Sequence, residues 1–566
     1  MTQKHLQLRL HGLRWSRLML TFLVTLVLSA GLAFGQADQG AITGTVSDST
    51  GARIPNAQVT LTSVDTGLVL TTKADPSGFY IFAPVKIGNY TITATANGFQ
   101  KTTRKGLHLD VQQRLAVPVT LTPGTTAETV VVTGAPSLLQ TEEGSSGQVM
   151  STKTINDTPL NGRNWVFIAQ LAAGVAPPTG SRGANGGDFN ANGQRAEQNN
   201  FILDGVDNNN NVVDFLNGAS YIVRPPPDAL AEFKIQTGSY SAEFGHSAGA
   251  VVNASIKSGT NAIHGDLWEY VRNDAFDIRQ QFQGDNPVPK YRQNQFGATL
   301  GFPIIKNRLF FFGDTEANRI VFAESHTNLT VPTALMRTGD FSELLNPADV
   351  PNGTPVTLYE PDQNNSGTTV MPGNKLTSDQ IDALAQKLMN LYPLPSPGLE
   401  HQTYNNYNVQ SNVTDNTFQW DTRMDYNVSS KDQMFARFSY SHEQAFHAPP
   451  LGSVMDGGNF GDTGNVFSLG ENFAFSETHI FTPTLTNEFR FGYNYGHFGF
   501  HQVNANTDIS SQLGLGGVPY APLNGGLPYI SVTGYSHFGA PQFYVSDEHN
   551  NVFQVLDNVM KQIGNH

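Results

Sequence analysis

The stretch SAGAVVNASIKSGTNAIHGDLWEY, residues 247–270, changes character at its centre. Before the turn signal KSGTN, small residues and alternating apolar positions predict a closely packed strand. After that turn, Trp268 and Tyr270 begin a strand that carries large aromatic side chains. The stretch therefore predicts a junction between two β-rich units, one tightly packed and one lined with aromatic residues.

The strands that follow residue 261 alternate aromatic and charged side chains. The segments TFQWDTRMDYN (417–427) and NEFRFGYNYG (487–496) both have period 2. A lipid-facing barrel wall turns apolar and aromatic side chains outward and charged ones toward its lumen. We therefore expect a lipid-facing set, Phe418, Trp420, Phe438, Tyr440, Phe489 and Phe491, and a lumen-facing set, Arg423, Arg437 and Arg490. The alternation is imperfect in IHGDLWEYV (263–271), where His264 and Asp266 share a face with Trp268 and Tyr270.

The region before residue 247 combines short regular elements with a long polar stretch. Trp165, Ile168, Ala169 and Ala172 recur at helical spacing and predict one short amphipathic helix whose apolar stripe is core. The stretch GSRGANGGDFNANGQRAEQNNFILDGVDNNNN (180–211) is too poor in apolar residues to hold regular structure alone, so it needs a neighbour to order it. Two strands are expected next, one through Phe233 and Ile235 and one through Val252, Ala254 and Ile256.

Residues 41–122 show a separate series of short period-2 runs. The runs are Ile42/Gly44/Val46, Ala57/Val59/Leu61, Phe79/Ile81, Tyr90/Ile92/Ala94 and Leu115/Val117/Val119/Leu121. The turn signals DSTGARIPN, DPSG and IGN separate them. This spacing predicts a small antiparallel β-sandwich in which one face of each strand is buried.

Composition excludes several classes of protein. Charged residues make up 14% of the 566 residues, and Gly (55), Phe (36) and Tyr (18) are plentiful, which favours extended β-structure with polar loops. Because Cys is absent, the chain has no disulfide, thiolate metal site or cysteine nucleophile. Excess acidic charge, 47 Asp and Glu against 33 Lys and Arg, makes nucleic acid an improbable partner.

The N-terminus has the pattern of a secretory signal peptide. Lys4, Arg9, Arg14 and Arg17 precede the apolar run LMLTFLVTLVLSAGLAFG, which ends in small residues. We expect cleavage after Gly35; a retained anchor is the alternative. No later run approaches the length of a membrane helix, so residence in a membrane would require strands.

Residues 42–100, from ITGTVSDSTGARIPNAQ to TATANGFQ, resemble the carboxypeptidase regulatory-like domain. The resemblance rests on the D-x-x-G-x-x-(I/L)-x-(N/G)-A turn and the G-x-(Y/F) strand and covers nearly the whole segment. It implies a non-catalytic sandwich. An unspecified immunoglobulin-like spacer is the alternative and would share the fold.

The stretch from Asp228 to Tyr270 resembles the end of the plug and the first barrel strand of TonB-dependent outer-membrane receptors. Further matching segments are LDGVD (203–207), NGQRAEQNNF (192–201), FGATLGFPIIKNRLFFFGDTEANR (296–319) and VPTALMRTGDFS (331–342). With the preceding sandwich, these segments are similar to the Oar-like subgroup. Five segments in the same order are hard to obtain by chance.

The resemblance also suggests where energy is coupled. Three consecutive valines in a Pro/Gly/Thr linker would be an aggregation hazard unless another strand pairs with them. The segment ETVVVTG resembles the TonB box, which pairs as an added strand with the periplasmic protein TonB. The coupling residues would be Glu128, Thr129, Val130, Val131, Val132, Thr133 and Gly134. The alternative is an ordinary edge strand of the preceding sandwich.

The expected fold class is mainly β, with an N-terminal sandwich, a small α/β plug and part of a transmembrane antiparallel barrel. The expected boundaries are 1–35 for the signal peptide, 36–124 for the sandwich, 125–135 for the linker, 136–260 for the plug and 261–566 for the barrel. Because residues 325–413 look poor in strands, the remainder fits about eight to ten strands rather than the ~22 of plugged transporters. We therefore expect a truncated reading frame or a fragment.

Three motifs suggest other chemistry, and we favour none of them. GHSAG (245–249) matches the nucleophile elbow around Ser247, but a strand-like segment follows where the elbow needs a helix. DFNANGQRAEQN (188–199) starts like a calcium loop, yet its twelfth residue is Asn199 instead of Glu, so a solvated loop is expected. HEQAFH (442–447) is one residue longer than the zinc signature H-E-x-x-H and is expected in an exposed loop.

The sequence thus predicts a non-enzymatic receptor that imports an extracellular ligand across the outer membrane, with energy supplied through TonB. Its expected partners are TonB with its inner-membrane complex, outer-membrane lipid and a ligand that the sequence does not identify, and no cofactor is expected. The sandwich and the coupling segment would be periplasmic. The rival is a secreted or surface-attached β-rich adhesin, and an enzyme that uses Ser247 comes third.

Overall fold

The computed structural model describes most of the chain. The described residues are 39–124, 129–133, 144–178, 188–211, 220–278, 288–360, 369–457, 463–482, 484–540 and 545–561. The expected signal peptide, residues 1–35, lies outside them, as do Glu128 and Gly134 of the expected coupling segment.

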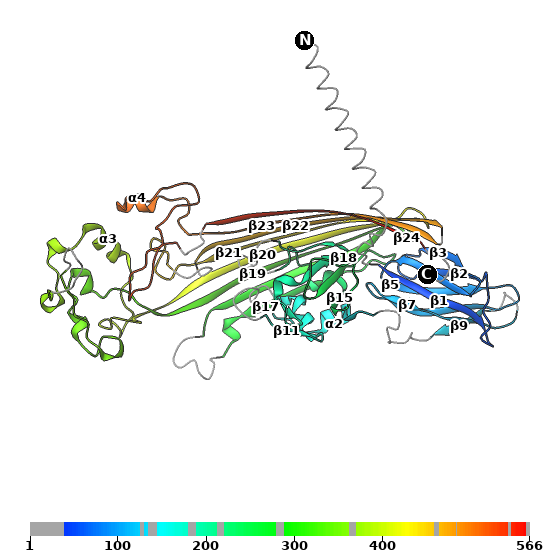
Figure 1. Ribbon diagram of the computed structural model, residues 1–566, viewed down its shortest axis with the longest axis horizontal. Coiled ribbons are helices and arrows are strands. Elements are labelled where there is room, and N and C mark those ends of the chain that lie inside the picture. Colours follow the sequence, from blue (N-terminus) through cyan, green and yellow to red (C-terminus); the bar gives the residue numbers. More distant parts are fainter. Residues whose placement is uncertain are drawn as a thin grey trace, which may run out of the picture.

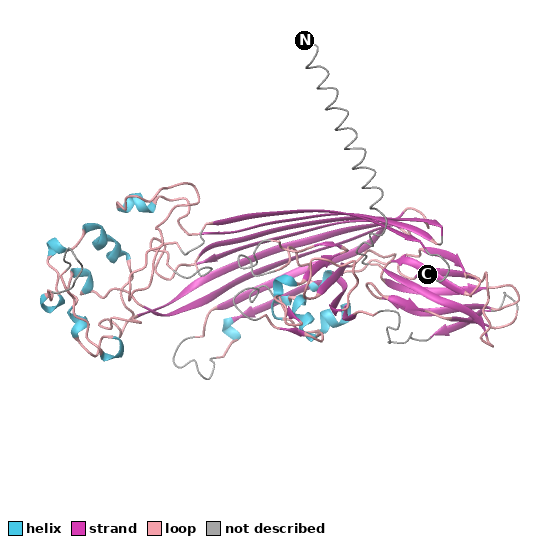
Figure 2. Cartoon of the chain, viewed as in Figure 1, coloured by secondary structure: helices cyan, strands magenta, loops and turns pink. Residues whose placement is uncertain are grey.

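Three β-rich parts make up the molecule. A wall of long strands runs along its length, the plug lies against one face of this wall, and the sandwich lies at one end (Figure 1). Strands dominate every part, and most helices belong to the plug and to the loops at the end away from the sandwich (Figure 2). The predicted mainly-β fold with sandwich, plug and antiparallel wall is therefore confirmed.

The sandwich contains two facing sheets. One has the order β4-β1-β7, with β8 also paired to β1, and the other has the order β3-β2-β5-β6-β9. The strands are β1 (Gly40–Asp48), β2 (Gln58–Ser63), β3 (Val69–Lys73), β4 (Phe79–Val85), β5 (Gly88–Thr95), β6 (Lys101–Leu109), β7 (Arg114–Ala116), β8 (Val119–Leu121) and β9 (Thr129–Thr133). Alternate residues of both sheets form the core, including Ile42, Val59 and Ile92.

The sandwich core matches the predicted positions except in β4. There the buried side chains are Tyr80 and Phe82 instead of Phe79 and Ile81. The Tyr80 hydroxyl donates to the carbonyl of Val117 at 2.5 Å. Tyr80 can be buried because its hydroxyl has this internal partner. Since side chains alternate along a strand, the buried face of β4 is then the one that carries Tyr80 and Phe82, and not the predicted one.

The plug is a five-stranded mixed sheet with short helices. Its order is β10-β15-β16-β13-β14, in which β13 and β16 are parallel. The strands are β10 (Ser146–Ser151), β13 (Asn200–Leu203), β14 (Val206–Asp207), β15 (Leu230–Gly238) and β16 (Val251–Ile256), and β11 (Val175–Ala176) pairs separately with β12 (Asn190–Ala191). The helical elements are α2 (Thr152–Asp157), η1 (Asn161–Arg163), η2 (Trp165–Leu171), η3 (Ala196–Gln198) and η5 (Pro227–Ala229).

The two strands predicted around Phe233 and Val252 are confirmed as β15 and β16. The predicted amphipathic helix is the 3-10 helix η2, and Trp165, Ile168 and Ala169 are buried as expected. Of the polar stretch, the structure describes residues 188–211, and Phe189 among them is fully buried in the plug core. That core also contains Phe312 and Phe498 of the wall, so plug and wall share one apolar interior.

The wall is one antiparallel sheet of eight described strands in sequential order. They are β17 (Leu267–Asn273), β18 (Tyr291–Ile305), β19 (Leu309–Leu329), β20 (Tyr407–Asn427), β21 (Asp432–His447), β22 (Gly464–Thr482), β23 (Leu485–His501) and β24 (Ser546–Lys561). β17 and β24 are its two edges, so the described wall is not closed. Eight strands lie within the predicted range.

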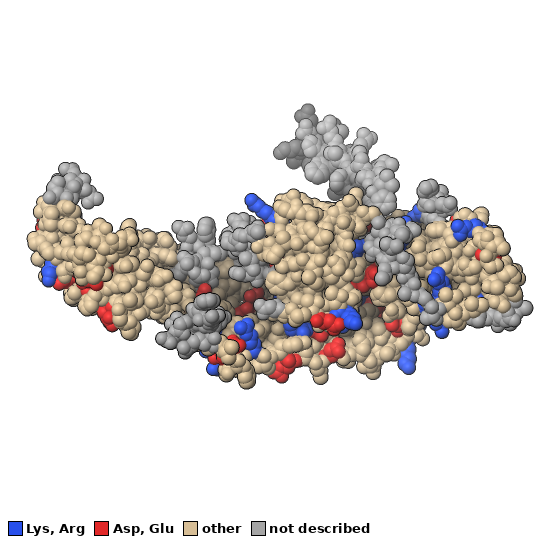
Figure 3. Space-filling view, turned by 90° about the horizontal axis from the view of Figure 1, so that it is seen from below, with Lys and Arg blue, Asp and Glu red and all other residues tan. Residues whose placement is uncertain are grey.

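The predicted alternation holds across the wall. In β23, every second residue from Thr486 to Phe498 is buried, while the residues between them are partly exposed. Arg423, Arg437 and Arg490 are at most 4% exposed and face the plug. The aromatic set lies on the opposite face of the strands. Seen from below, the side on which the plug lies, acidic and basic side chains are scattered along the molecule (Figure 3).

Long connections gather at the end away from the sandwich. They follow β19, β21 and β23 and pack around a shared apolar cluster that includes Val331, Met455 and Phe538. Their helical elements are α3 (Ala383–Leu391), α4 (Ile509–Leu513), η7 (Met336–Thr338), η8 (Ser342–Leu345), η9 (Pro351–Gly353), η10 (Pro372–Asn374) and η11 (Ser378–Gln380); η6 (Asp274–Phe276) follows β17. Among the described residues, no helix has the length and hydrophobicity to cross a bilayer.

Candidate functional site

The tip of the plug is a tight turn between β13 and β14. Asp204 and Gly205 occupy its centre with φ of +49° and +74°, as a two-residue Asp-Gly hairpin requires. A Cβ at position 205 would lie 1.3 Å from Nη1 of Arg490. Glycine therefore serves two purposes here, because it tolerates the positive φ and it leaves room for an arginine of the wall.

Three arginines of the wall meet this turn. Nη1 of Arg423 lies 2.6 Å from Oδ1 of Asp204, and Nε of Arg437 lies 3.1 Å from Oδ2. Nη1 of Arg490 donates to the Asp204 carbonyl at 3.1 Å. We call these four residues the Asp204 cluster; they come from the plug and from β20, β21 and β23. The predicted lumen-facing arginines thus contact the LDGVD segment.

The Asp204 cluster is almost completely removed from water. Asp204 and the Arg437 side chain are 0% exposed. Burial of separate charges costs free energy, which the short charge-assisted hydrogen bonds between them offset. Removing one partner from such a cluster would leave an uncompensated buried charge. The cluster is therefore a strong constraint on where the plug sits in the wall.

Neutral hydrogen bonds extend this contact along the plug tip. Nδ2 of Asn472 donates to the Asp207 carbonyl at 2.8 Å, and Nδ2 of Asn494 donates to the Asn209 carbonyl at 3.1 Å. The Asp207 amide donates to Oε1 of Gln554 at 2.9 Å. Carbonyls and amides that the plug cannot satisfy itself are thus satisfied by the wall.

A second plug–wall contact explains the imperfect alternation near residue 268. Nε1 of Trp268 donates to Oε2 of Glu316 at 3.1 Å. The guanidinium of Arg163, from η1 of the plug, lies 5.3 Å from the Trp268 ring centre and 4.5 Å from that of Tyr270. Both aromatic side chains therefore face the plug, and their cation–π contacts account for aromatic residues on the inner face.

The sandwich is connected to the partners of the Asp204 cluster. Asp425 lies 3.1 Å from Nε of Arg423 and also pairs with Lys86 of the sandwich. Glu488 pairs with Arg490 and accepts a hydrogen bond from Gln39 at 3.1 Å. Two series of polar contacts thus connect the sandwich, through residues of the wall, to the turn at the tip of the plug.

A direct contact joins the sandwich to the plug. The Val111 amide donates to Oε1 of Glu232 on β15, and His108 at the end of β6 faces the same carboxylate. Burial raises the pKa of Glu232, and the Glu232 carboxylate raises the pKa of His108. Sequence reasoning missed this contact because isolated charges at strand ends carry no periodic signal.

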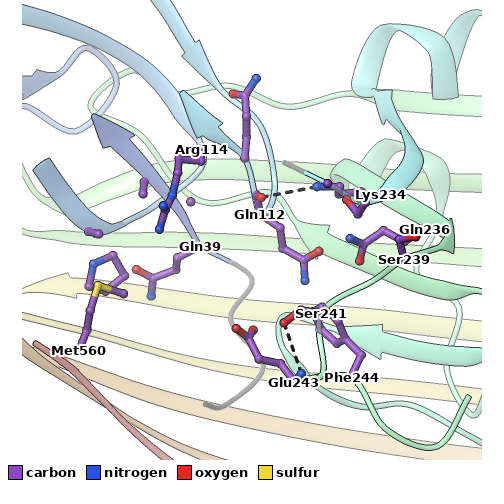
Figure 4. A pocket seen from close by; sticks show the side chains of 17 residues that line it. Gln39, Gln112, Arg114, Lys234, Gln236, Ser239, Ser241, Glu243, Phe244 and Met560 are labelled. Atoms are coloured by element: carbon purple, nitrogen blue, oxygen red, sulfur yellow. Dashed lines mark hydrogen bonds between the residues drawn. The ribbon is translucent and has the colours of Figure 1, made fainter. Parts of the chain in front are cut away.

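Two cavities lie where sandwich, plug and wall meet. The first, of about 500 Å³, lies between Arg114 of the sandwich, Lys234 and Gln236 of β15, and Met560 of β24 (Figure 4). The second, of about 490 Å³, is bordered by Lys86, His108, Glu232 and Asp425, among other residues. Both are at the sandwich end of the wall, so the sandwich does not fill the space beside the plug.

The expected coupling segment is a strand on the sandwich. Thr129–Thr133 form β9, which pairs in parallel with β6 so that Val131 lies opposite Thr103. Val130, Val131 and Val132 are 37–52% exposed. β9 is the last strand of its sheet among the described residues. In this structure the valines have their pairing partner within the chain, which is the arrangement of the edge-strand alternative.

The three unfavoured motifs serve structural roles. Ser247 Oγ lies 3.1 Å from the carbonyl oxygens of both Gln198 and Ala250, which share its one hydrogen, and the strand β16 follows it. The solvated loop expected at residues 188–199 is wrong, because Asp188 and Asn199 are buried and bond to plug residues. The exposed loop expected at residues 442–447 is also wrong, because these residues complete β21.

Family comparisons assign a type to each part. The family described as outer membrane beta barrel domain matches residues 255–566, more than half of the chain. The carboxypeptidase regulatory-like domain matches residues 41–122, and the TonB-dependent receptor plug domain matches residues 140–252.

The chain is also similar to individual proteins. The chain is 28% identical over 309 residues to a Myxococcus xanthus protein described as TonB-dependent transporter Oar, which covers 50% of this chain and 28% of that protein. Among solved structures, the ferric enterobactin receptor PfeA of Pseudomonas aeruginosa has a TM-score of 0.39 at 11% identity, covering 74% of this chain and 47% of that one. The siderophore receptor PirA of Acinetobacter baumannii has a TM-score of 0.31 at 13% identity, covering 65% and 50%. The chain thus spans about half the length of these receptors and less than a third of the curated relative.

Proposed function

The chain belongs to the outer-membrane β-barrel family, and on this basis we propose that it is a TonB-dependent receptor that binds an extracellular ligand and imports it with energy from the inner membrane. The observation that carries this proposal is the Asp204 cluster. Buried ion pairs hold the plug against the wall, so the plug would block the lumen. Energy would be needed to separate these ion pairs and move the plug. No catalytic step belongs to this function.

The arrangement of turns and loops supports an orientation in the membrane. Barrels of this type have short periplasmic turns and long extracellular loops. The turns after β18, β20 and β22 are short and lie at the sandwich end, whereas the long loops lie at the other end. The sandwich and β9 would then be periplasmic, following export through a cleaved signal peptide, and the loops around Val331 and Phe538 would be exposed to the ligand.

We assign coupling to Glu128–Gly134. Pairing by β-strand addition uses main-chain groups, so an exposed strand at a sheet edge is suited to it. β9 meets this description, since its valines are partly exposed and it ends its sheet among the described residues. TonB could pair at the open edge of β9, or could take β9 away from β6. In either case, the linker would transmit the force from TonB to the plug.

We also propose the division 1–35, 36–124, 125–135, 136–260 and 261–566 for signal peptide, sandwich, linker, plug and wall. The contact of sandwich and wall through Lys86 and Asp425 favours a working unit in which all three parts act together. Lipid would contact the aromatic face of the wall.

Fractionation of cells separates this function from the adhesin alternative. The protein should sediment with outer membranes and be released only by detergent, because its aromatic strand face needs lipid or detergent. A matched secreted sandwich protein serves as the control for release by salt and chelator. Release of the full chain by salt or chelator alone would contradict the proposal and support a surface-attached adhesin.

A further inference from the structure

One side-chain cluster outside the Asp204 cluster combines an imidazole with carboxylates from two domains. His108 is the last residue but one of β6 in the sandwich, Asp110 directly follows this strand, and Glu232 lies on β15 of the plug. We propose that His108, Asp110 and Glu232 bind a divalent transition-metal ion, and that this ion joins the sandwich to the plug. The proposal rests on this geometry and is independent of the transported ligand.

The distances fit metal ligands better than hydrogen-bond partners. Nε2 of His108 lies 3.5 Å from Oδ1 of Asp110 and 3.8 Å from Oε2 of Glu232. Ligand bonds of about 2.0–2.2 Å to a tetrahedral ion place neighbouring ligand atoms about 3.3–3.6 Å apart. A small closing movement of the Glu232 side chain would complete the set. One imidazole and two carboxylates suit zinc or a similar ion, with water at the remaining position.

Two other histidine clusters provide a contrast. Nε2 of His497 lies 2.6 Å from Oδ1 of Asp547, and Nδ1 of His479 lies 2.6 Å from Oδ1 of Asp432. These distances are direct hydrogen bonds, and an ion could enter only after each pair had separated. In the His497 cluster, Nε2 of a second histidine, His549, lies 3.7 Å from the same Asp547 oxygen, but that oxygen already pairs with His497. Of these three clusters, only that of His108 has no imidazole–carboxylate distance as short as a direct hydrogen bond.

Neighbouring groups orient the ligand atoms. Nδ1 of His108 lies 3.0 Å from Oδ1 of Asn89. The amide oxygen therefore accepts the Nδ1 hydrogen, and the neutral imidazole would offer its Nε2 lone pair to an ion. The Val111 amide donates to Oε1 of Glu232, which leaves Oε2 directed at His108. Such supporting hydrogen bonds fix the tautomer and the orientation of metal ligands.

Burial and access also favour an ion. The Glu232 side chain is 4% exposed, and a buried carboxylate gains free energy from a nearby positive charge. His108 is 53% exposed at its side chain, and both residues border the 490 Å³ cavity between the domains. An ion can therefore reach the ligands from solvent. Once bound, it would connect β6 to β15 and hold the sandwich against the plug.

Metal binding by the full chain in detergent tests the proposal. Equilibrium dialysis against Zn²⁺, followed by metal analysis, should find an ion whose affinity falls at least tenfold in His108→Ala and in Glu232→Gln. Gln is isosteric and can still accept the Val111 hydrogen bond, so this variant should keep its fold. Asn89→Ala should weaken binding by about 10–100-fold through loss of the supporting hydrogen bond. His479→Ala is the matched control and should bind as the wild type does.

A second measurement tests the link between domains. Hydrogen exchange at the Val111 amide should be slower with Zn²⁺ than with chelator in the wild type, and this difference should disappear in His108→Ala. Undiminished Zn²⁺ affinity in His108→Ala would overturn the proposal. An equal loss in His479→Ala would also overturn it, because the ion would then be bound elsewhere.

Discussion

Oδ1 of Asp204, at the tip of the plug, lies 2.6 Å from Nη1 of Arg423 in the wall. The same guanidinium pairs with Asp425, which in turn pairs with Lys86 of the sandwich. The turn of the plug is therefore one end of a series of ion pairs that reaches through the wall to the sandwich. Movement of the sandwich and release of the plug are expected to be coupled through this series.

The first prediction concerns the Asp204 carboxylate. Asp204→Asn should destabilise the seated plug by about 3–5 kcal/mol, because it removes the buried carboxylate that pairs with both Arg423 and Arg437. The Ile256 amide donates to Oδ1 of Asp204 at 3.1 Å, so its hydrogen exchange reports the contact directly. Asp432→Asn, at the start of β21 and outside the Asp204 cluster, is the control and should leave this exchange close to unchanged. Equal effects of both substitutions would contradict the role of the cluster.

The second prediction concerns the outer face of the wall. Phe491→Arg should cost about 2–4 kcal/mol near the middle of the bilayer, whereas Tyr495→Arg, nearer the loop end of β23, should cost about 0–1 kcal/mol. Unfolding in lipid vesicles measures both. Single cysteines can be added freely because the chain has none. If aqueous reagents label cysteines at 489 and 491 faster than one at 490, the assigned faces are wrong.

The third prediction concerns the order of the plug tip. Residues 204–211 should be cleaved rapidly by protease in an isolated plug, residues 135–259, because their partners Asn472, Asn494 and Gln554 belong to the wall. Residues 188–200 should also lose protection, but more slowly, because Phe189 is buried in the plug core. Equal protease resistance of the isolated plug and the full chain in both regions would contradict this dependence.

The fourth prediction concerns pH and the long loops. Burial raises the pKa of Asp456 to about 6, so the packed loop binds a proton more tightly than the unfolded loop does. Loop packing should therefore gain stability as pH falls through about 6 and lose it as pH rises. Asp456→Asn should remove this dependence and stabilise the loop at neutral pH by about 1–3 kcal/mol. Hydrogen exchange at the Gly539 amide, which donates to Met455 at 2.7 Å, measures it; an unchanged pH profile in the variant would contradict the assignment.

The sequence was most informative where one physical pattern dominates. Alternation in β20, β21 and β23 located the lumen-facing arginines, but it did not indicate that Arg423 would contact Asp204 of the plug. That contact depends on the position of the plug relative to the wall. The periodicity of a strand carries no information about that position. Tyr80 was misplaced because a single hydrogen bond to Val117 decided which face of β4 is buried.

Other features depend on neighbours that lie far away in the chain. In the sequence, Trp268 and Tyr270 resemble the aromatic residues at the lipid-facing surface of a barrel. Their contacts with Arg163 and Glu316 show that they face the plug. The polar loop at residues 188–199 looked solvated because its partners, such as Ser220 and Ala250, follow much later. The contact of His108 with Glu232 joins two domains and leaves no local trace in the sequence.

The most direct test of energy coupling is pairing of the full chain with the periplasmic domain of TonB. Val131→Pro removes a backbone N–H from β9 and should abolish capture of that domain. Val131→Ala keeps the backbone donor and should retain capture, because strand addition relies on main-chain hydrogen bonds. Capture by the wild type and Val131→Ala but not by Val131→Pro is the predicted result. Capture of TonB by Val131→Pro at the wild-type level would contradict the coupling assignment.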